Sequence, residues 1–546
     1  MTLPNFKDRR FSNKVIAAIV LLHFISLMMA ARFYDQLWLN QFALYGTLSL
    51  YLVIMPILWL WHRATKRLPA VDTLSDIRKS FEETEWPPYD PYRYFSLETG
   101  LFTGLNERRK PNYISWEEFN TTHMQVVGTT GAGKGVMSNM ILIQCALKGQ
   151  RVIIFDPKND KYASRVIARA AKDHGLPFHL IDLRPDTPPQ VNPFRSATYS
   201  EMKELLITIF DLGRKGDIAD FYRILDRRAA RDVIRRAGSN PTIKRMLQVA
   251  DDSPYITDDD AQAFLEQLTE MTELDAIDTD EGPDLAELIS TPGFLYIIGS
   301  IRSEESIQCQ KLLLLRILQI IEKRREESAD RLPIALMLDE FKYILSPPAL
   351  QALGCVRDKN CHLILAHQSV GDLEECKGLD PAAVRGAVLE NTGIKFIYRA
   401  KTGETAEWAS KLSGKIIAKT RRTDIQQSAF DAATAQYTEV ERALLTENDI
   451  LALPKLVGML FGVGLAKRCQ AARMPLGERP KLVPAPRAPE IVREEKAKAK
   501  PKAKAEPQNQ TAADSAPSAQ PATQAASSSS QSATGNSDDP AKKNLT

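Results

Sequence analysis

Residues 124–149 read MQVVGTTGAGKGVMSNMILIQCALKG, in which a short apolar segment, a glycine-rich loop and a helical pattern follow one another. The loop has the spacing G-x-x-x-x-G-K, which predicts a phosphate-binding P-loop when it lies between a strand and a helix. Backbone N–H groups of such a loop converge on phosphate, and its lysine reaches the β and γ oxygens. A chance glycine-rich turn is the alternative. The predicted nucleotide-binding residues are Gly128, Thr129, Thr130, Gly131, Ala132, Gly133, Lys134 and Gly135.

A second apolar run predicts the acidic strand that accompanies a P-loop. Residues 333–338 (PIALML) contain no polar side chain and are followed by Asp339 and Glu340, as in a buried parallel strand with a Walker B pair. An apolar run followed by two acids also arises by chance, but the upstream P-loop favours function. We expect Asp339 to hold Mg²⁺ and Glu340 to polarise the water that attacks ATP. The Ser or Thr hydroxyl that usually binds Mg²⁺ is missing, because Gly135 follows the lysine.

The loops after two other expected strands carry further candidates. The run RVIIF (151–155) leads into Asp156 and Lys158, and HLIDL (179–183) predicts a third strand. Because parallel sheets bind ligands at the carboxyl ends of their strands, Asp156 and Lys158 would face the nucleotide site or a neighbouring subunit. A solvated, charged turn is the alternative.

The segment after the Walker B pair supplies two more candidate site residues. The expected strand CHLILA (361–366) leads to Gln368, which would sense the γ-phosphate from the strand beside Walker B. Arg357 precedes this strand and would serve as an arginine finger across a subunit boundary. A surface cation is the simpler interpretation of Arg357.

Residues 200–290 separate the third strand from the run FLYII (294–298), and their helical periodicity predicts an inserted all-α domain. Residues 251–287 carry 14 acidic and no basic side chains. Six arginines, named below, precede this acidic segment, so basic and acidic side chains occupy different parts of the insert. This separation suggests a docking surface, with the arginines toward DNA phosphates and the acids toward a basic partner. The alternative is a solvated helix whose arginines pair with Asp226 and Asp232. The DNA-binding candidates on one predicted helix face are Arg223, Arg227, Arg228, Arg231 and Arg235, followed by Arg236.

Two uncharged runs near the N-terminus, 15–31 and 42–61, are long enough to cross a bilayer as helices. Residues 1–67 carry 8 basic and 2 acidic side chains, and only Arg32 among the bases lies in the connecting loop. The positive-inside rule therefore places both ends in the cytoplasm. A signal peptide or a buried helical hairpin is the alternative.

Composition excludes other classes of protein. The chain has 546 residues, 44% of them hydrophobic, with 71 basic and 68 acidic side chains, which excludes collagen-like and wholly disordered chains. The six cysteines lack metal-ligand spacing and are expected to be free thiols. Residues 485–546, rich in Lys, Ala, Pro, Ser and Gln, predict a disordered tail, either inert or a tether for a partner.

These motifs occur in an ordered set that resembles the type IV coupling proteins of bacterial conjugation and type IV secretion, the TraD/TraG class. The similarity covers residues 10–480 and includes the two expected spans, the P-loop, DPKND (156–160) and VNPF (191–194). It continues with MLDEF (337–341), HQS (367–369) and residues 391–414.

This resemblance implies a RecA-like α/β motor that uses ATP and Mg²⁺ as a homo-hexamer at the bacterial inner membrane. It implies that the motor passes single-stranded DNA with its relaxase, or effectors, to the type IV secretion channel. The insert would recognise DNA or substrate, the tail would bind relaxosome accessory proteins, and Arg357 and Gln368 would be the finger and the sensor. The expected domains are an anchor (1–67), the motor (68–199 and 291–484), the insert (200–290) and the tail (485–546).

Two other functions remain open at this point. A DNA pump related to FtsK would share the motor, but that family usually has more membrane spans and a C-terminal winged-helix DNA reader. A nucleotide-binding docking receptor with little hydrolysis is suggested by Gly135.

Overall fold

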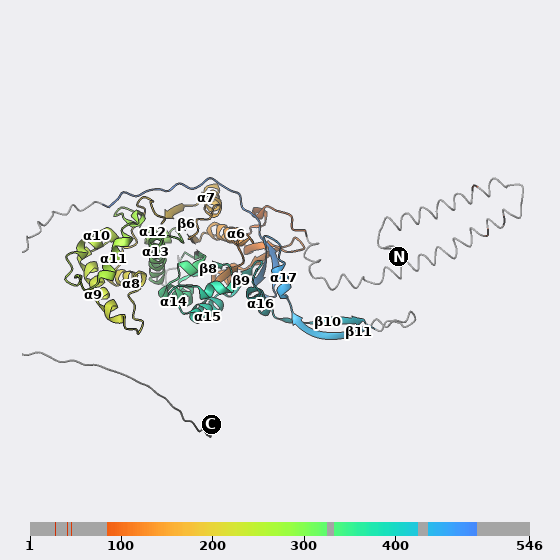
Figure 1. Cartoon of the computed structure of the whole chain (residues 1–546). Coiled ribbons are helices and arrows are strands. Elements are labelled where there is room, and N and C mark those ends of the chain that lie inside the picture. The colour runs from red at the N-terminus through yellow and green to blue at the C-terminus, as the bar shows by residue number, and fades with distance from the viewer. Residues whose placement is uncertain are drawn as a thin grey trace, which may run out of the picture. The chain divides into compact units, whose positions relative to one another are not determined.

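The computed structural model describes residues 85–324, 332–423 and 435–488, together with Met28, Gln41 and Tyr45 (Figure 1). Apart from Met28 and Tyr45, the two runs expected to span a membrane lie outside the described residues, as does the chain after residue 488. Within the described part, no helix is long and apolar enough to cross a bilayer. All six cysteines are described and free, as the sequence predicted.

An eleven-stranded sheet forms the centre of the described fold, in the order β2-β1-β13-β12-β9-β3-β8-β7-β4-β6-β5. The segment from β9 to β5 is parallel, and β3, which carries the P-loop, lies between β9 and β8. The parallel strands are β9 (Ile394–Ile397), β3 (Met124–Val127), β8 (Cys361–His367), β7 (Ile334–Asp339), β4 (Arg151–Asp156), β6 (Gly293–Ile298) and β5 (Phe178–Asp182).

The remaining strands extend the sheet in antiparallel fashion at the β9 edge. They are β12 (Val457–Phe461), β13 (Lys467–Gln470), β1 (Leu101–Leu105) and β2 (Pro111–Ile114), with the short helices η3 (Pro91–Tyr94) and α5 (Trp116–Asn120) before and after the β1–β2 hairpin. The predicted α/β fold class is therefore confirmed at the level of a large, mainly parallel sheet.

Both faces of the parallel strands are covered by helices, which explains their uninterrupted apolar sequences. Along β7, Leu336 and Leu338 pack into one core, whereas Ala335 and Met337 pack into the core on the other face. The second core is closed by α6 (Lys134–Leu147) and α7 (Ala163–Asp173). The first is closed by α13 (Glu304–Glu322), α14 (Pro347–Cys355) and α15 (Pro381–Asn391).

The chain between β5 and β6 is helical. Its elements are α8 (Tyr199–Ile209), α9 (Asp220–Ala237), α10 (Ile243–Ala250), α11 (Gln262–Met271), η4 (Asp275–Ile277) and α12 (Leu285–Ser290). A capping box formed by Thr198 and Glu201 starts α8. The buried residues of these helices belong to the same apolar core as α13 and one face of the sheet. The helical insert is thus packed onto the motor core, and its exact domain boundaries stay a prediction.

Two further segments complete the described chain. Between β9 and β12, α16 (Gly403–Leu412) and α17 (Glu447–Leu451) flank a long hairpin of β10 (Lys415–Thr423) and β11 (Ala435–Ala443). After β13, the strap of residues 471–488 crosses α7, where Arg165 Nε donates to the Gly477 carbonyl at 2.8 Å. It ends at the helical insert, where Thr279 Oγ1 donates to the Pro486 carbonyl at 2.6 Å.

Candidate active site

The P-loop joins the carboxyl end of β3 to the first residue of α6, Lys134. Gly133 has a φ of +134°, and a Cβ at this position would lie 2.9 Å from Cε1 of Tyr398. Any other residue there would be strained and would collide with the ring. Gly135 differs, because a Cβ there would meet nothing within 4 Å. Packing therefore does not exclude the usual Ser or Thr at position 135.

The Lys134 ammonium group lies over its own loop. Its Nζ donates a 2.5 Å hydrogen bond to the Gly128 carbonyl. Burial lowers the pKa of Lys134, and the carboxylates of Glu340 and Asp339 oppose that effect. In this arrangement a backbone carbonyl provides the acceptor that a phosphate oxygen would provide in a nucleotide complex.

Asp339 ends β7 and pairs in register with Ala366 of the neighbouring β8. Burial, followed by repulsion from Asp156 and Glu340, raises the pKa of Asp339 to about 7. A bound cation would relieve this repulsion. Among the described residues, no group of three or more His, Cys, Asp or Glu side chains could hold a metal alone. This donor set fits Mg²⁺ held by one carboxylate, water and substrate phosphates.

Glu340 follows Asp339 in a left-handed conformation, with φ +43° and ψ +47°. Such a conformation costs about 1–3 kcal/mol for a non-glycine residue, and residues of this kind cluster at functional sites. Glu340 is only 3% exposed, and its backbone N–H donates to Asp339 Oδ1 at 3.1 Å. The strained turn directs the carboxylate into the space between the ends of the strands.

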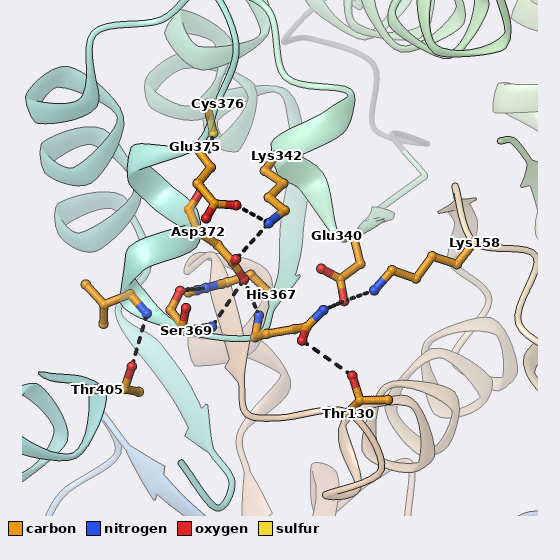
Figure 2. Close-up of polar contacts among 12 residues, drawn as sticks. Thr130, Lys158, Glu340, Lys342, His367, Ser369, Asp372, Glu375, Cys376 and Thr405 are labelled. Carbon is orange, nitrogen blue, oxygen red and sulfur yellow. Dashed lines mark hydrogen bonds and ion pairs between the residues drawn. The ribbon is translucent and has the colours of Figure 1, made fainter. Parts of the chain in front are cut away.

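A network of polar contacts connects the P-loop with the Walker B pair (Figure 2). Lys158 Nζ lies 2.6 Å from Glu340 Oε1, and Gln368 Nε2 donates to the same oxygen at 3.0 Å. Gln368 Oε1 also accepts a hydrogen bond of 3.4 Å from the Thr130 hydroxyl. Gln368 thus contacts both the P-loop and Glu340, and its expected role as a γ-phosphate sensor stays a prediction. Lys158 faces the site, which contradicts the solvated-turn alternative for this residue.

Neighbouring residues hold this network in place. The Asp372 carboxylate accepts from Gln368 N at 2.6 Å and from Lys342 Nζ at 2.9 Å. His367 bridges Gln125 Nε2 and the Ser369 carbonyl, each at 2.7 Å, and burial lowers its pKa to about 4. No motif in the sequence pointed to Lys342 or to Asp372 as a residue of this site. The S-x-x-D spacing of the capping box at η7 (Val370–Glu374) was the available signal.

Asp156 positions the loop that carries Lys158. Its carboxylate accepts hydrogen bonds from Lys158 N at 3.2 Å, from Asp160 N at 2.7 Å and from the Tyr296 hydroxyl at 2.7 Å. With three donors bound, Asp156 organises the turn after β4.

Arg357 lies away from the nucleotide site of its own chain. It belongs to η6 (Val356–Lys359), which precedes β8, whereas Gln368 follows the opposite end of that strand. Seven strand residues at about 3.3 Å each separate the two ends by roughly 20 Å. The Arg357 side chain is 58% exposed and lies 3.8 Å from Asp358. Its expected role as a finger for another subunit stays a prediction.

The structure divides the arginines of α9 into two groups. Arg223 is bound by Asp217 and Asp220, each at 2.6 Å, and its side chain is 16% exposed. Arg227 Nη1 donates to the Leu212 carbonyl at 2.6 Å. Both guanidinium groups are engaged in holding the start of the helix. Arg223 and Arg227 are thus bound within the chain, and DNA binding by the five candidate arginines stays a prediction.

The other three arginines are exposed to solvent. Arg228 lies over the Tyr255 ring at 5.9 Å, and Arg235 over the Tyr199 ring at 5.4 Å. Arg231 Nε donates to the Arg227 carbonyl at 3.1 Å. The sequence analysis also missed exposed rings at the start of α9, those of Phe221 (66% exposed) and Tyr222 (63%). The alternative of a solvated helix holds in part, because Arg236 pairs with Asp232 at 2.5 Å.

Comparisons with known proteins identify two family domains and a relative of the chain. Residues 100–319 match the family described as Helicase HerA, central domain, and residues 333–455 match the TraM recognition site of TraD and TraG. The chain is 32% identical over 330 residues to Mobilization protein A of Escherichia coli. This alignment covers 60% of the chain and 60% of that relative.

Solved structures share the fold. The plasmid coupling protein TrwB in complex with ADP and Mg²⁺ is 15% identical with a TM-score of 0.51, over 74% of this chain and 93% of TrwB. The unbound bacterial conjugative coupling protein TrwBdeltaN70 is 16% identical with a TM-score of 0.50, over 68% and 89%. The comparisons confirm the predicted resemblance to the type IV coupling proteins, because the chain joins a HerA-type domain to a TraD- and TraG-type segment on one motor fold.

Proposed function

We propose that this chain is an ATP-driven type IV coupling protein that passes a relaxase–DNA complex, or effectors, to a type IV secretion channel during conjugation. The observation that carries the proposal is the joining of Thr130, Glu340 and Gln368 in one network at the carboxyl edge of the sheet. This network belongs to a chain with a TraD- and TraG-type segment. The same geometry supports an ATPase.

The residues of the site divide the work of hydrolysis. Lys134 and the backbone of the P-loop would bind the phosphates, and Asp339 would hold Mg²⁺, which neutralises developing charge when bound. Glu340 would orient and polarise the attacking water, within reach of Gln368. Gln368 would report the γ-phosphate, since it contacts both Thr130 and Glu340.

Assembly and location complete the proposal. The apolar runs 15–31 and 42–61 support an anchor in the inner membrane, and the bases around them support a cytoplasmic motor with both termini inside. A homo-hexamer is supported by Arg357, which would be remote from any nucleotide in its own chain. Arg228, Arg231 and Arg235 would contact single-stranded DNA. The tail would contact relaxosome accessory proteins.

The test is the ATPase activity of the full-length chain in detergent, with and without single-stranded DNA. We expect DNA-stimulated turnover that Lys134→Ala abolishes and that Lys172→Ala, on the exposed last turn of α7, leaves intact. Turnover that persists in Lys134→Ala would refute the motor.

The docking receptor remains the second candidate, because Gly135 removes a usual Mg²⁺ ligand. It predicts that the purified chain binds nucleotide without appreciable hydrolysis, and that Glu340→Gln still supports transfer in a mating assay. A pump related to FtsK predicts DNA-stimulated turnover together with unimpaired mating in a deletion strain.

A further inference from the structure

Two lysines face the phosphate end of the site, and each is bound to an oxygen of the protein. Lys134 Nζ donates to the Gly128 carbonyl at 2.5 Å, and Lys158 Nζ contacts Glu340 Oε1 at 2.6 Å. Phosphate oxygens are the natural partners of both ammonium groups in a nucleotide complex. Each contact therefore occupies a cation that ATP would attract.

The contact of Lys158 differs in its consequence, because its partner is the expected catalytic carboxylate. Glu340 Oε1 carries two donors at once, Lys158 and Gln368, while Oε2 is buried and has no hydrogen-bond partner in the described structure. Each carboxylate oxygen has about two lone-pair sites, so these two donors leave Oε1 without a site for an attacking water. In this arrangement Glu340 Oε1 is not available to orient that water.

The surroundings allow the Lys158 side chain to move without its backbone. The turn after β4 is fixed by Asp156, whose carboxylate binds the N–H groups of Lys158 and Asp160. The Lys158 side chain is 34% exposed, against 4% for that of Glu340. A change of rotamer in its flexible four-carbon stem would move the ammonium group without moving the turn.

We propose that the Lys158 ammonium group blocks Glu340 until the γ-phosphate of ATP draws it away. We call this contact between Lys158 and Glu340 the latch. With the site free of triphosphate, the Lys158 ammonium group occupies Glu340 Oε1. When ATP is bound, Lys158 moves to the γ-phosphate and leaves Glu340 with Gln368 to orient the water. This inference rests on the proposed function, since it assigns Lys158 to the same nucleotide site.

Binding measurements on the full-length chain in detergent test the latch without requiring turnover. We expect Lys158→Met to weaken the affinity for fluorescent ATPγS by about tenfold and to leave that for the matching ADP analogue within about twofold, since only the triphosphate offers the γ-oxygens that the ammonium group would bind. Lys161→Met is the matched control, because Lys161 belongs to the same loop, is exposed and lies over the Tyr162 ring at 5.6 Å. Equal weakening of both nucleotides by Lys158→Met would overturn the proposal.

A double-mutant cycle tests the latch itself. Glu340→Gln removes the charge that holds Lys158, so it should tighten ATPγS binding in the native background and have no such effect in Lys158→Met. The same tightening in both backgrounds would overturn the latch. Thermal unfolding of each variant confirms that it is folded. If the chain binds both analogues as expected but does not hydrolyse ATP, the motor function fails while the latch stands.

Discussion

The carboxyl edge of the parallel sheet and the α9 helix both carry clustered charges, but they use them differently. At the sheet edge, Glu340 and Lys158 follow different strands. In this largely buried site, Lys158 Nζ lies 2.6 Å from Glu340 Oε1. On α9, the pairs are between near neighbours, such as Arg223 with Asp220 and Arg236 with Asp232. Contacts between distant segments indicate a built site, whereas neighbouring pairs on one helix mainly stabilise that helix.

The largest expected effect is at the sheet edge. Glu340→Gln keeps the size of the side chain and removes its charge, so kcat for ATP should fall by about 10²–10⁴-fold while nucleotide binding persists. Steady-state ATPase and nucleotide-binding assays on the full chain measure both quantities. Glu404→Gln is the control, because the Glu404 side chain is exposed and its ion-pair partner at 3.6 Å is Arg385, which is not a residue of the nucleotide site. Similar decreases in the two variants would mean that the sheet edge has no special role.

The P-loop itself offers a matched pair of glycines. Gly133→Ala places a Cβ 2.9 Å from the Tyr398 ring at a φ of +134° and should cost about 1–3 kcal/mol of unfolding free energy. Gly135→Ala enters open space in the first turn of α6 and should be neutral or stabilising by up to about 1 kcal/mol. Denaturant unfolding distinguishes them, and equal costs would contradict the described loop geometry.

The free energy of unfolding should also depend on acid pH, because the sheet contains the buried histidine His362. Burial lowers the pKa of His362 to about 3, and neither ring nitrogen has a hydrogen-bond partner in the described structure. Because unfolding returns the group to its ordinary pKa near 6.5, the unfolded state binds more protons below that pH. Stability therefore falls as the pH drops from about 6.5 toward 3, by up to roughly 1.4 kcal/mol per pH unit for one group.

His362→Phe should remove this contribution because it removes the titratable group and keeps an aromatic ring edge-on to that of Phe119, whose centroid lies 4.4 Å from that of His362. Unfolding free energies measured between pH 4.5 and 7 should show a slope smaller by about one proton. His174→Phe, on the exposed end of α7, is the control. An unchanged slope in His362→Phe would indicate that His362 is accessible to protons in the folded chain.

The contrast between the sheet edge and α9 also explains which features the sequence could predict. A P-loop, an apolar strand ending in Asp339 and the following strand ending near Gln368 have fixed places in a parallel sheet, so their meeting follows from topology. The roles of Lys342 and Asp372 were missed because they depend on how η5 (Phe341–Tyr343) and η7 pack. On α9, helical periodicity predicted a helix, and the structure has one over Asp220–Ala237. It did not show that Arg223 is bound by Asp217, which lies before the helix.

The smallest expected effect tests the exposed arginines. Arg231→Glu should weaken binding of single-stranded DNA to the full chain and reduce the slope of log K against log salt by about 0.7 for each phosphate that is no longer neutralised. Arg223→Glu should leave that slope unchanged, because its guanidinium is already bound by Asp217 and Asp220. Fluorescence anisotropy at several salt concentrations measures both. Since Arg223→Glu breaks two ion pairs, thermal unfolding must confirm that α9 is retained. Equal slopes for the two variants would mean that exposure does not select DNA contacts on this helix, and the distinction between built sites and helix-stabilising charges would fail there.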